Sequence, residues 1–393
     1  MEHELRAEIM GPAEILVELV GINSVNPAQT GPRSGEANET RLAEEVAARC
    51  DRLGAETWLD EVEPGRSNVY ARFAGSRPGT VCVDVHLDTV SVEHMTIPPF
   101  AAEIRDGRVY GRGSVDTKAS LAVLLWLLEQ HPQRPLPGPT LFLVGTVSEE
   151  AGGLAGAYRF SDWAQENSIS FDEMIVAEPT LCAPVYGHKG GVGIEITVHG
   201  SAAHSSKPHL GMNAIDGASR IIQAYAQEQH RLQDSVDDLD PALAPMGAGT
   251  LSVTEISGGL ARNIIPDACH LYAGRRTVPG EDPNVIYAQL AELAVEAAHP
   301  ATVTTQMANG RGSPAFFQAP ESPLIRRLSE LGDAPPEVAT YGSNALVYHN
   351  IAQQIVVFGP GSIDQAHQAI EWIDLEEIGR VTKIYANWLG VSH

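Results

Sequence analysis

Two histidines and four carboxylates stand beside short apolar segments of this sequence: His86, Asp116, Glu149, Glu150, Glu178 and His367. Imidazole and carboxylate oxygen are the ligands that suit zinc, manganese and cobalt in proteins. The set contains no cysteine, which disfavours a closed structural zinc site. Taken together, these residues predict a metal site that carries out chemistry.

His86 and Asp88 form an H-x-D at the end of the apolar run VCVDV. Because successive side chains of a strand point to opposite faces, the single residue between them places both on the same side. A histidine that binds a metal needs its other ring nitrogen held by an acceptor, and a carboxylate two residues along can supply one. Alone, the pair also fits a purely structural role.

The next carboxylates come from two different settings. Asp116 lies in the glycine-rich stretch YGRGSVDTKAS, which opens onto an apolar helix, and Glu149 and Glu150 follow the run TLFLVGTV. Adjacent buried carboxylates are costly unless a cation compensates their charge. Considered singly, Asp116 also fits a helix N-cap, and the two glutamates also fit an exposed helix start.

Glu178 follows the run MIVA, and His367 lies in GPGSIDQAH after the run IVVFG. Two divalent ions would carry four positive charges, against three negative charges from Asp116, Glu150 and Glu178. The one positive charge that remains would favour the binding of hydroxide over water. Glu149 is the one carboxylate of the set that this count does not use as a ligand. It can take a proton from a water whose pKa the ions lower, and pass it to a leaving nitrogen.

The apolar runs that precede these residues predict buried strands, and apolar helical segments at 119–130 and 324–331 lie between them. This alternation is typical of an α/β fold with an open mixed sheet flanked by helices. Ligands of such sheets bind outside the carboxyl ends of the strands. The polar residues are expected to meet there.

The chain has 393 residues, of which 43% are hydrophobic, and this length favours two or three domains. Between 187 and 298 the segments VGIEITVHG and LSVTEISGG alternate in period two, as half-exposed antiparallel strands do. Helical patterns at 213–229 and 283–298 complete an inserted α+β domain. We expect residues 1–186 plus 299–393 to form the metal-binding domain and 187–298 the insert.

A formal net charge of −24 would repel a phosphate backbone, because nucleic-acid binding draws its affinity from clustered Lys and Arg. Nucleic acid is therefore not an expected partner. The most apolar run, residues 121–128, is far shorter than the roughly 20 residues that cross a bilayer. We expect no membrane span.

The four cysteines, Cys50, Cys82, Cys182 and Cys269, stand far apart without C-x-x-C spacing. This argues against both a disulfide scaffold and a structural zinc cluster. The first residues, MEHELRAEIM, lack the basic and apolar regions of a secretory signal. We therefore expect reduced thiols and a cytoplasmic protein.

Several motifs occur in one order along most of the chain: VHLDTV, YGRGSVDTK, SEEAGG, AEPT, GSAAHSSKPHLGMNAI, RNIIPD, RRTVPGE and GPGSIDQAH. This series resembles the co-catalytic zinc metallopeptidases and deacylases that include acetylornithine deacetylase, succinyl-diaminopimelate desuccinylase, aminoacylase and glutamate carboxypeptidase. The resemblance implies a zinc-peptidase-like domain and an inserted lid or dimerisation domain. It also implies a homodimer.

The resemblance implies a role for each residue of the set. His86, Asp116 and Glu178 would bind one metal, and Asp116, Glu150 and His367 the second, so that Asp116 bridges the two ions. Glu149 would be the general base and Asp88 would orient His86. The two ions would be zinc, with cobalt or manganese as the alternatives.

In the insert, the resemblance implies that His204 helps to hold the reacting carbonyl, from the same chain or from a second subunit. Asn263 and Arg276 would meet the substrate carboxylate or the developing oxyanion, because an arginine fork matches a carboxylate. Arg275 is an adjacent competitor for that role. Asn344 stands where many relatives carry an acidic residue, and we expect it to shape the acyl or side-chain pocket.

We therefore expect a metal-dependent hydrolase of C–N bonds that cleaves the amide of an N-acyl amino acid and is similar to acetylornithine deacetylase. A dipeptidase or carboxypeptidase is the nearest alternative, since the same chemistry serves both. An aminohydrolase that releases ammonia and a non-catalytic binding protein are the further alternatives.

Overall fold

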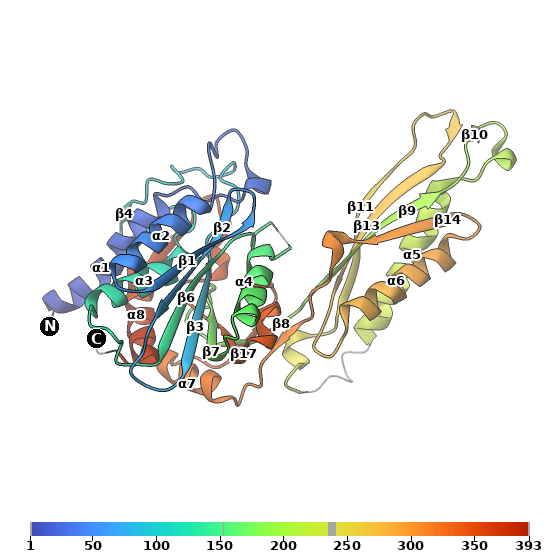
Figure 1. Ribbon diagram of the computed structural model, residues 1–393. Helices are drawn as coiled ribbons and strands as arrows, with labels where there is room; N and C mark the ends of the chain where they lie inside the picture. Colours follow the sequence, from blue (N-terminus) through green and yellow to red (C-terminus); the bar gives the residue numbers. More distant parts are fainter. Residues whose placement is uncertain (1, 152, 235–240, 392–393) are drawn as a thin grey trace. The chain divides into compact units, whose positions relative to one another are not determined.

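The computed structural model describes residues 2–151, 153–234 and 241–391 (Figure 1). The chain divides into two compact units. Unit 1 comprises Met1–Tyr186, Gln318–Glu337 and Ser343–His393, and unit 2 comprises Gly187–Phe317 and Val338–Gly342.

A mixed sheet forms the centre of unit 1, with its strands in the order β1-β2-β6-β3-β7-β17. The strands β6, β3, β7 and β17 run parallel to one another, whereas β1 and β2 are antiparallel additions at one edge. The bounds are β1 Glu56–Glu63, β2 Arg66–Phe73, β3 Thr80–His86, β6 Thr140–Thr146, β7 Phe171–Val176 and β17 Ala352–Val357.

The parallel strands are apolar along nearly their whole length because helices cover both faces of the sheet. In β3 and β6 every residue after the first is buried. The structure confirms that the runs VCVDV, TLFLVGTV, EMIVA and IVVFG belong to buried strands of an open mixed sheet.

Helices α1, α3 and α8 pack against one another, and α4 lies on the opposite face of the sheet from them (Figure 1). The predicted helices at 119–130 and 324–331 are confirmed as α3 and α7. The helices of this unit are α1 Glu2–Val20, α2 Thr40–Arg52, α3 Lys118–Gln130, α4 Ala155–Glu166, α7 Pro323–Gly332 and α8 Leu375–Leu389.

The remaining short strands form a small separate sheet and extend the large one beyond β17. A three-stranded sheet has the order β18-β5-β4, and β8 pairs with β17, β15 and β16. The bounds are β4 Ile104–Arg105, β5 Arg108–Tyr110, β8 Val185–His188, β15 Phe316–Phe317, β16 Glu337–Ala339 and β18 Trp372–Asp374.

Unit 2 is an antiparallel sheet of order β11-β13-β9-β14 with two helices packed on one face. Along β9 buried and more exposed residues alternate, as the period-two sequence pattern predicts. A separate two-stranded ladder joins β10 to β12. The elements are β9 Val192–His199, β10 Ala203–His204, α5 Ala214–Asp234, β11 Thr250–Gly258, β12 Ile264–Ile265, β13 Ala268–Arg276, α6 Pro283–Ala298 and β14 Thr302–Met307.

The second boundary of the insert differs from the one expected at residue 298. Unit 2 continues to Phe317, because β14 pairs along its whole length with β9 and so belongs to the same sheet. Its sequence, TVTTQM, gives little apolar signal, since the strand lies at an edge and is at most half-buried. Within the part of the chain described here, no helix is both long and apolar enough to span a membrane.

Candidate metal centre

The carboxyl ends of the four parallel strands meet at one edge of the sheet of unit 1. His86 is the last residue of β3, and the segments after β6, β7 and β17 lead to Glu149, Glu150, Glu178 and His367. The strand ends therefore bring five of the six predicted side chains to the same edge, His367 by way of a longer segment after β17. The glycine-rich loop before α3 brings Asp116 to the same edge.

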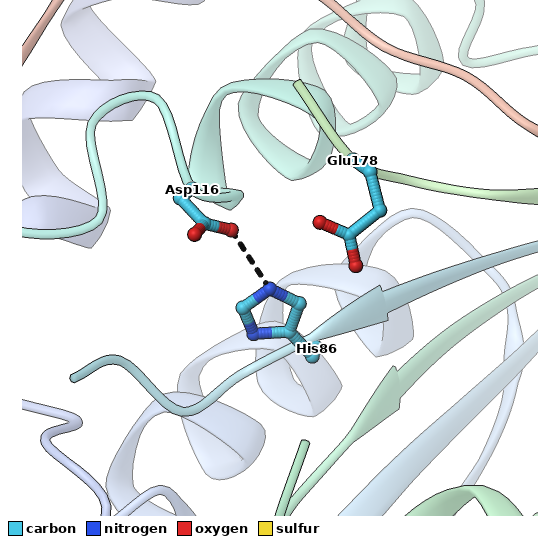
Figure 2. A group of neighbouring side chains, drawn as sticks. All are labelled: His86, Asp116 and Glu178. Atoms are coloured by element: carbon cyan, nitrogen blue, oxygen red, sulfur yellow. Dashed lines mark hydrogen bonds and ion pairs between the residues drawn. The ribbon is translucent and has the colours of Figure 1, made fainter. Parts of the chain in front are cut away.

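The first group of possible metal ligands consists of His86, Asp116 and Glu178 (Figure 2). Their nearest ligand atoms lie within 4.8 Å of one another, and all three residues are buried. The Nε2 atom of His86 is 3.0 Å from Oδ1 of Asp116. The other ring nitrogen, Nδ1, is 2.9 Å from the backbone oxygen of Asp88 and donates to it when Nε2 is the ligand.

The second group consists of Asp116, Glu150 and His367. Nε2 of His367 is 3.2 Å from Oδ2 of Asp116 and 3.1 Å from Oε2 of Glu150. The imidazole is half-exposed, whereas the Glu150 side chain is only 6% exposed. Asp116 therefore offers one carboxylate oxygen to each group.

Asp88 contacts the His86 ring through its backbone oxygen, and not through the carboxylate that the H-x-D pattern suggested. Its Oδ1 is 3.8 Å from Nδ1 of His86, beyond hydrogen-bond distance. The carboxylate instead accepts the backbone N–H groups of Glu149 at 3.1 Å and Glu150 at 3.0 Å, and the side-chain amide of Asn26 at 2.8 Å. The backbone oxygen of Asp88 thus contacts the His86 imidazole, and its carboxylate accepts the backbone N–H groups of the turn that carries Glu149 and Glu150.

A tight backbone turn presents Asp116. Gly113 has φ +85°, and a Cβ added there would lie 3.0 Å from the Thr89 side chain and 3.1 Å from that of Lys118. Glycine meets both demands because it has no Cβ. The Lys118 ammonium donates to the backbone oxygens of Leu19 at 3.0 Å and Ile22 at 2.8 Å, which anchors the start of α3 to the end of α1.

Burial and charge act in opposite directions on the acids of the two groups. Burial raises the pKa of Glu178 well above its ordinary value, although His86 opposes the shift. Burial alone would also raise the pKa of Asp116, but hydrogen bonds with His367 and His86 lower it overall. Hydrogen bonds to Asp116 and Glu150 raise the pKa of His367 to about 10.

These donors fit divalent cations. Imidazole nitrogens and carboxylate oxygens face one another at ligand spacing, and three of the carboxylates need positive charge close by to stay ionised in a buried place. Metal ions require the same residues in their deprotonated forms. The structure therefore holds a possible metal site, built from the residues that the sequence indicated.

Glu149 lies beside the two groups and belongs to neither. Its backbone is fixed by Asp88, as described above, and burial raises the pKa of its carboxyl group well above the ordinary value. The charge of His86 opposes this rise in pKa, and the charges of Glu150, Asp88 and Asp116 add to it.

Unit 2 brings two of its three predicted residues together and separates the third. His204 pairs with Ile264 in the β10–β12 ladder, and the backbone oxygen of Asn263 accepts the N–H of Ser205 at 2.9 Å. Arg276 ends β13, whose other end leads back to β12 (Figure 1). At about 3.3 Å per residue, β13 places Arg276 roughly 26 Å from Ala268, at the end of the strand that leads to β12 and His204.

The two arginines at the end of β13 have different surroundings. Arg275 is 2% exposed and forms an ion pair with Glu281 at 2.6 Å. Arg276 is exposed. Of the two, Arg276 is therefore the one whose guanidinium is accessible to a ligand.

Asn344 lies inside unit 1. It is 2% exposed, and its amide donates to Oδ2 of Asp84 at 2.9 Å and to the Thr146 hydroxyl at 3.0 Å. Asp84 precedes His86 by two residues in β3. This placement makes Asn344 part of a buried polar network and does not support the expected contact with a substrate.

Two residues of the N-terminal segment, for which sequence patterns predicted no role, lie beside the turn that carries Glu149 and Glu150. Asn26 donates to Asp88, and the side-chain amide of Gln29 donates to the backbone oxygen of Glu150 at 2.9 Å. Both contacts join positions more than 60 residues apart. The only local signal is the NP dipeptide at Asn26, which marks a turn.

Comparison with known proteins gives matches over most of the chain. The model of peptidase family M20/M25/M40 matches residues 82–390. An acetylornithine deacetylase of Myxococcus xanthus is 30% identical over 359 residues, which are 90% of this chain and 91% of the relative.

Solved structures show the same fold. A tripeptidase of Staphylococcus aureus superimposes with a TM-score of 0.74 at 21% identity, covering 96% of this chain and 97% of the other. A Bacillus subtilis protein described as a dinuclear metal-binding peptidase of the M20 family gives a TM-score of 0.68 at 15% identity, covering 98% of this chain and 100% of the other.

Proposed function

This chain belongs to peptidase family M20/M25/M40 and is a hydrolase of amide or peptide bonds, and from that premise we propose that it deacylates an N-acyl amino acid with two divalent metal ions. One observation carries the two-metal part. The Asp116 carboxylate lies between His86 and His367, with one oxygen 3.0 Å from the first imidazole and the other 3.2 Å from the second. The similarity to acetylornithine deacetylase supports the substrate class.

In this proposal five residues are metal ligands and one is a general base. His86, Asp116 and Glu178 would hold one ion, and Asp116, Glu150 and His367 the other, with zinc first and cobalt or manganese as alternatives. The bound ions would supply Lewis-acid polarisation of the substrate carbonyl and lower the pKa of the attacking water. Glu149 accepts the proton of that water and delivers it to the leaving nitrogen.

Asp88 supports this division by fixing Glu149 and Glu150 from the backbone. Its two carboxylate oxygens accept one backbone N–H each, which fixes the backbone of the turn that carries both glutamates. Glu150 can then point to the second ligand group while Glu149 remains outside both.

A substrate panel tests the proposed function. After reconstitution with zinc, cobalt or manganese, we expect kcat/KM for an N-acetyl amino acid to exceed that for dipeptides, tripeptides and N-succinyl amino acids at least tenfold, a difference of about 1.4 kcal/mol in transition-state binding. Amine release should be followed for each substrate at equal enzyme and metal concentrations.

Other outcomes of the panel assign the alternatives. A preference for dipeptides or tripeptides would make the chain a peptidase, in line with the tripeptidase that shares its fold. Release of ammonia from an amine would indicate an aminohydrolase. Full metal content without turnover on any substrate would indicate a binding protein.

We further propose that His204, Asn263 and Arg276 act on the substrate and that two copies of the chain take part. Arg276 is exposed at one end of β13, and His204 and Asn263 lie roughly 26 Å away at the other end. One copy of unit 2 therefore does not present all three to one small substrate. A homodimer meets the requirement if His204 reaches the site of the partner copy, where it would stabilise the developing oxyanion.

Mixing two inactive variants tests delivery from the partner. We expect partial activity when Glu149→Ala and His204→Ala proteins exchange subunits, because one site of the heterodimer then has both residues intact. A mixture of Glu149→Ala with Asp116→Ala is the matched control, since both changes lie in unit 1 and no site is restored.

Two results would contradict this proposal. Verified heterodimers without activity, from folded and metallated variants, would place His204 on the substrate of its own chain. A fully active His204→Ala protein would exclude a catalytic role for His204.

A cytoplasmic location remains a prediction. The four free, buried cysteine thiols agree with it.

A further inference from the structure

A buried ion pair lies next to the metal ligands without belonging to them. Arg112 and Glu371 form this pair through Nη1 and Oε2, and each side chain is 1% exposed. The two residues are 259 positions apart in the sequence. Arg112 stands four residues before Asp116, and Glu371 stands four residues after His367.

Glu371 holds the loop that carries Asp116. Its Oε1 accepts the backbone N–H groups of Gly113 at 3.0 Å, Val115 at 3.1 Å and Asp116 at 3.4 Å. Its backbone oxygen accepts the N–H of Gly111 at 3.0 Å. One residue therefore fixes four backbone amides of the loop, including that of the residue whose carboxylate is shared by both ligand groups.

Arg112 connects the same loop to two others. Its Nη2 donates to the backbone oxygen of Ser91 at 3.0 Å, in the segment after β3, and to that of Gln368 at 3.5 Å. Gln368 follows His367 directly. The guanidinium thus joins the segments that carry His86, Asp116 and His367.

The energetics do not favour a purely stabilising role. Removing two charges from water costs free energy that their attraction repays only with additional hydrogen bonds, and apolar replacements of such pairs are often neutral or stabilising. What apolar side chains cannot supply is the directed set of hydrogen bonds to three loops. A fork of donors on Arg112 and a carboxylate with two acceptors on Glu371 provide that set.

We propose that Arg112 and Glu371 are positioning residues that set the Asp116 carboxylate relative to the His367 imidazole and thereby determine the affinity for the two ions. This inference rests on the proposed function, because it takes the ligand roles of Asp116 and His367 from there. Both side chains are 1% exposed, so we assign neither of them a contact with the substrate.

The Arg112→Lys variant tests the inference. Lysine keeps the positive charge opposite Glu371 but loses the fork that reaches Ser91 and Gln368. We expect the affinity for Zn²⁺ and Co²⁺, measured by competition with a chelator, to fall about 10- to 100-fold, as it does when partners of metal ligands are changed. The visible absorption spectrum of the Co²⁺-loaded protein should change as well.

Arg327→Lys is the matched control. Arg327 forms an ion pair with Glu173 in β7 of the same unit, and Glu173 lies five residues before Glu178. The same chemical change there should leave both the metal affinity and the cobalt spectrum as in the wild type. A role limited to stability would lower the unfolding temperature in either variant without moving these two readouts.

The double variant Arg112→Met/Glu371→Gln covers the case in which the single change prevents folding. It leaves no unpaired charge in the interior, and the glutamine oxygen can still accept the loop amides. We expect it to fold and to show the same loss of affinity, because the links to Ser91 and Gln368 are gone. Wild-type affinity and spectrum in the folded double variant would overturn the inference, as would the same result in Arg112→Lys.

Failure of the two-metal function can be distinguished from failure of the positioning role. If the wild-type protein binds no divalent ions, the proposed two-metal function is wrong, whatever the variants do. If the wild type binds two ions and the variants match it, the two-metal function stands and the positioning role is wrong.

Discussion

In a Glu149→Gln protein, we expect both metal ions to remain bound and turnover to fall by about 100- to 10,000-fold, the usual contribution of general acid–base catalysis. Glutamine has nearly the size of glutamate but accepts no proton at neutral pH. Glu149 belongs to neither ligand group, and its backbone N–H bonds to Asp88, which the substitution leaves in place. Metal analysis and steady-state kinetics on the same preparation measure the two effects.

Glu44→Gln is the control for the change of charge, since Glu44 is exposed on α2 and belongs to neither ligand group. It should retain full turnover and metal content. Normal turnover in a fully metallated Glu149→Gln protein would exclude Glu149 as the base. Loss of the ions would instead show that Glu149 is a ligand.

The fold and the meeting of the six side chains were predictable because both follow from local patterns. Apolar runs of strand length, separated by helical periods, require a sheet with both faces covered, and parallel strands bring their carboxyl ends to one edge. A side chain that follows such a run is therefore placed by the run itself. His86, at the last position of β3, is the simplest case.

Contacts between distant segments were not predictable in this way. Glu371 resembles the nearby acidic residues Glu376 and Glu377, and only the folded chain buries it against Arg112. The side chain of Asp88 was assigned to His86 because they are neighbours in sequence, but Glu149 and Glu150 lie closer in space. Asn344 likewise acquires its partners, Asp84 and Thr146, through tertiary packing.

The boundary of unit 2 shows the same limit for whole elements. β14 is a polar edge strand, and an edge strand with no fully buried residue carries almost no apolar pattern. Its membership of the sheet is decided by pairing with β9, which is remote in sequence. Sequence patterns therefore located the core strands of the insert and missed its last one.

Asp116→Ala should remove both ions from the site, because its carboxylate offers one oxygen to each ligand group. Each group keeps two ligands, and the two histidines lose the acceptor that now lies 3.0 Å from His86 and 3.2 Å from His367. We expect metal content after dialysis to fall from about two ions per chain to well under one. Turnover should fall by roughly a thousandfold or more, since metal ions contribute several kcal/mol to such reactions at about 1.4 kcal/mol per tenfold.

His367→Ala is the comparison that isolates the shared role. His367 belongs only to the second group and its imidazole is half-exposed, so its removal should cost one ion and spare the ion of His86, Asp116 and Glu178. A metal content of about one in His367→Ala and near zero in Asp116→Ala is the expected pair of results. Equal metal loss in the two variants would show that the ions bind as one cooperative unit, and two ions retained in active Asp116→Ala would rule out the bridging carboxylate.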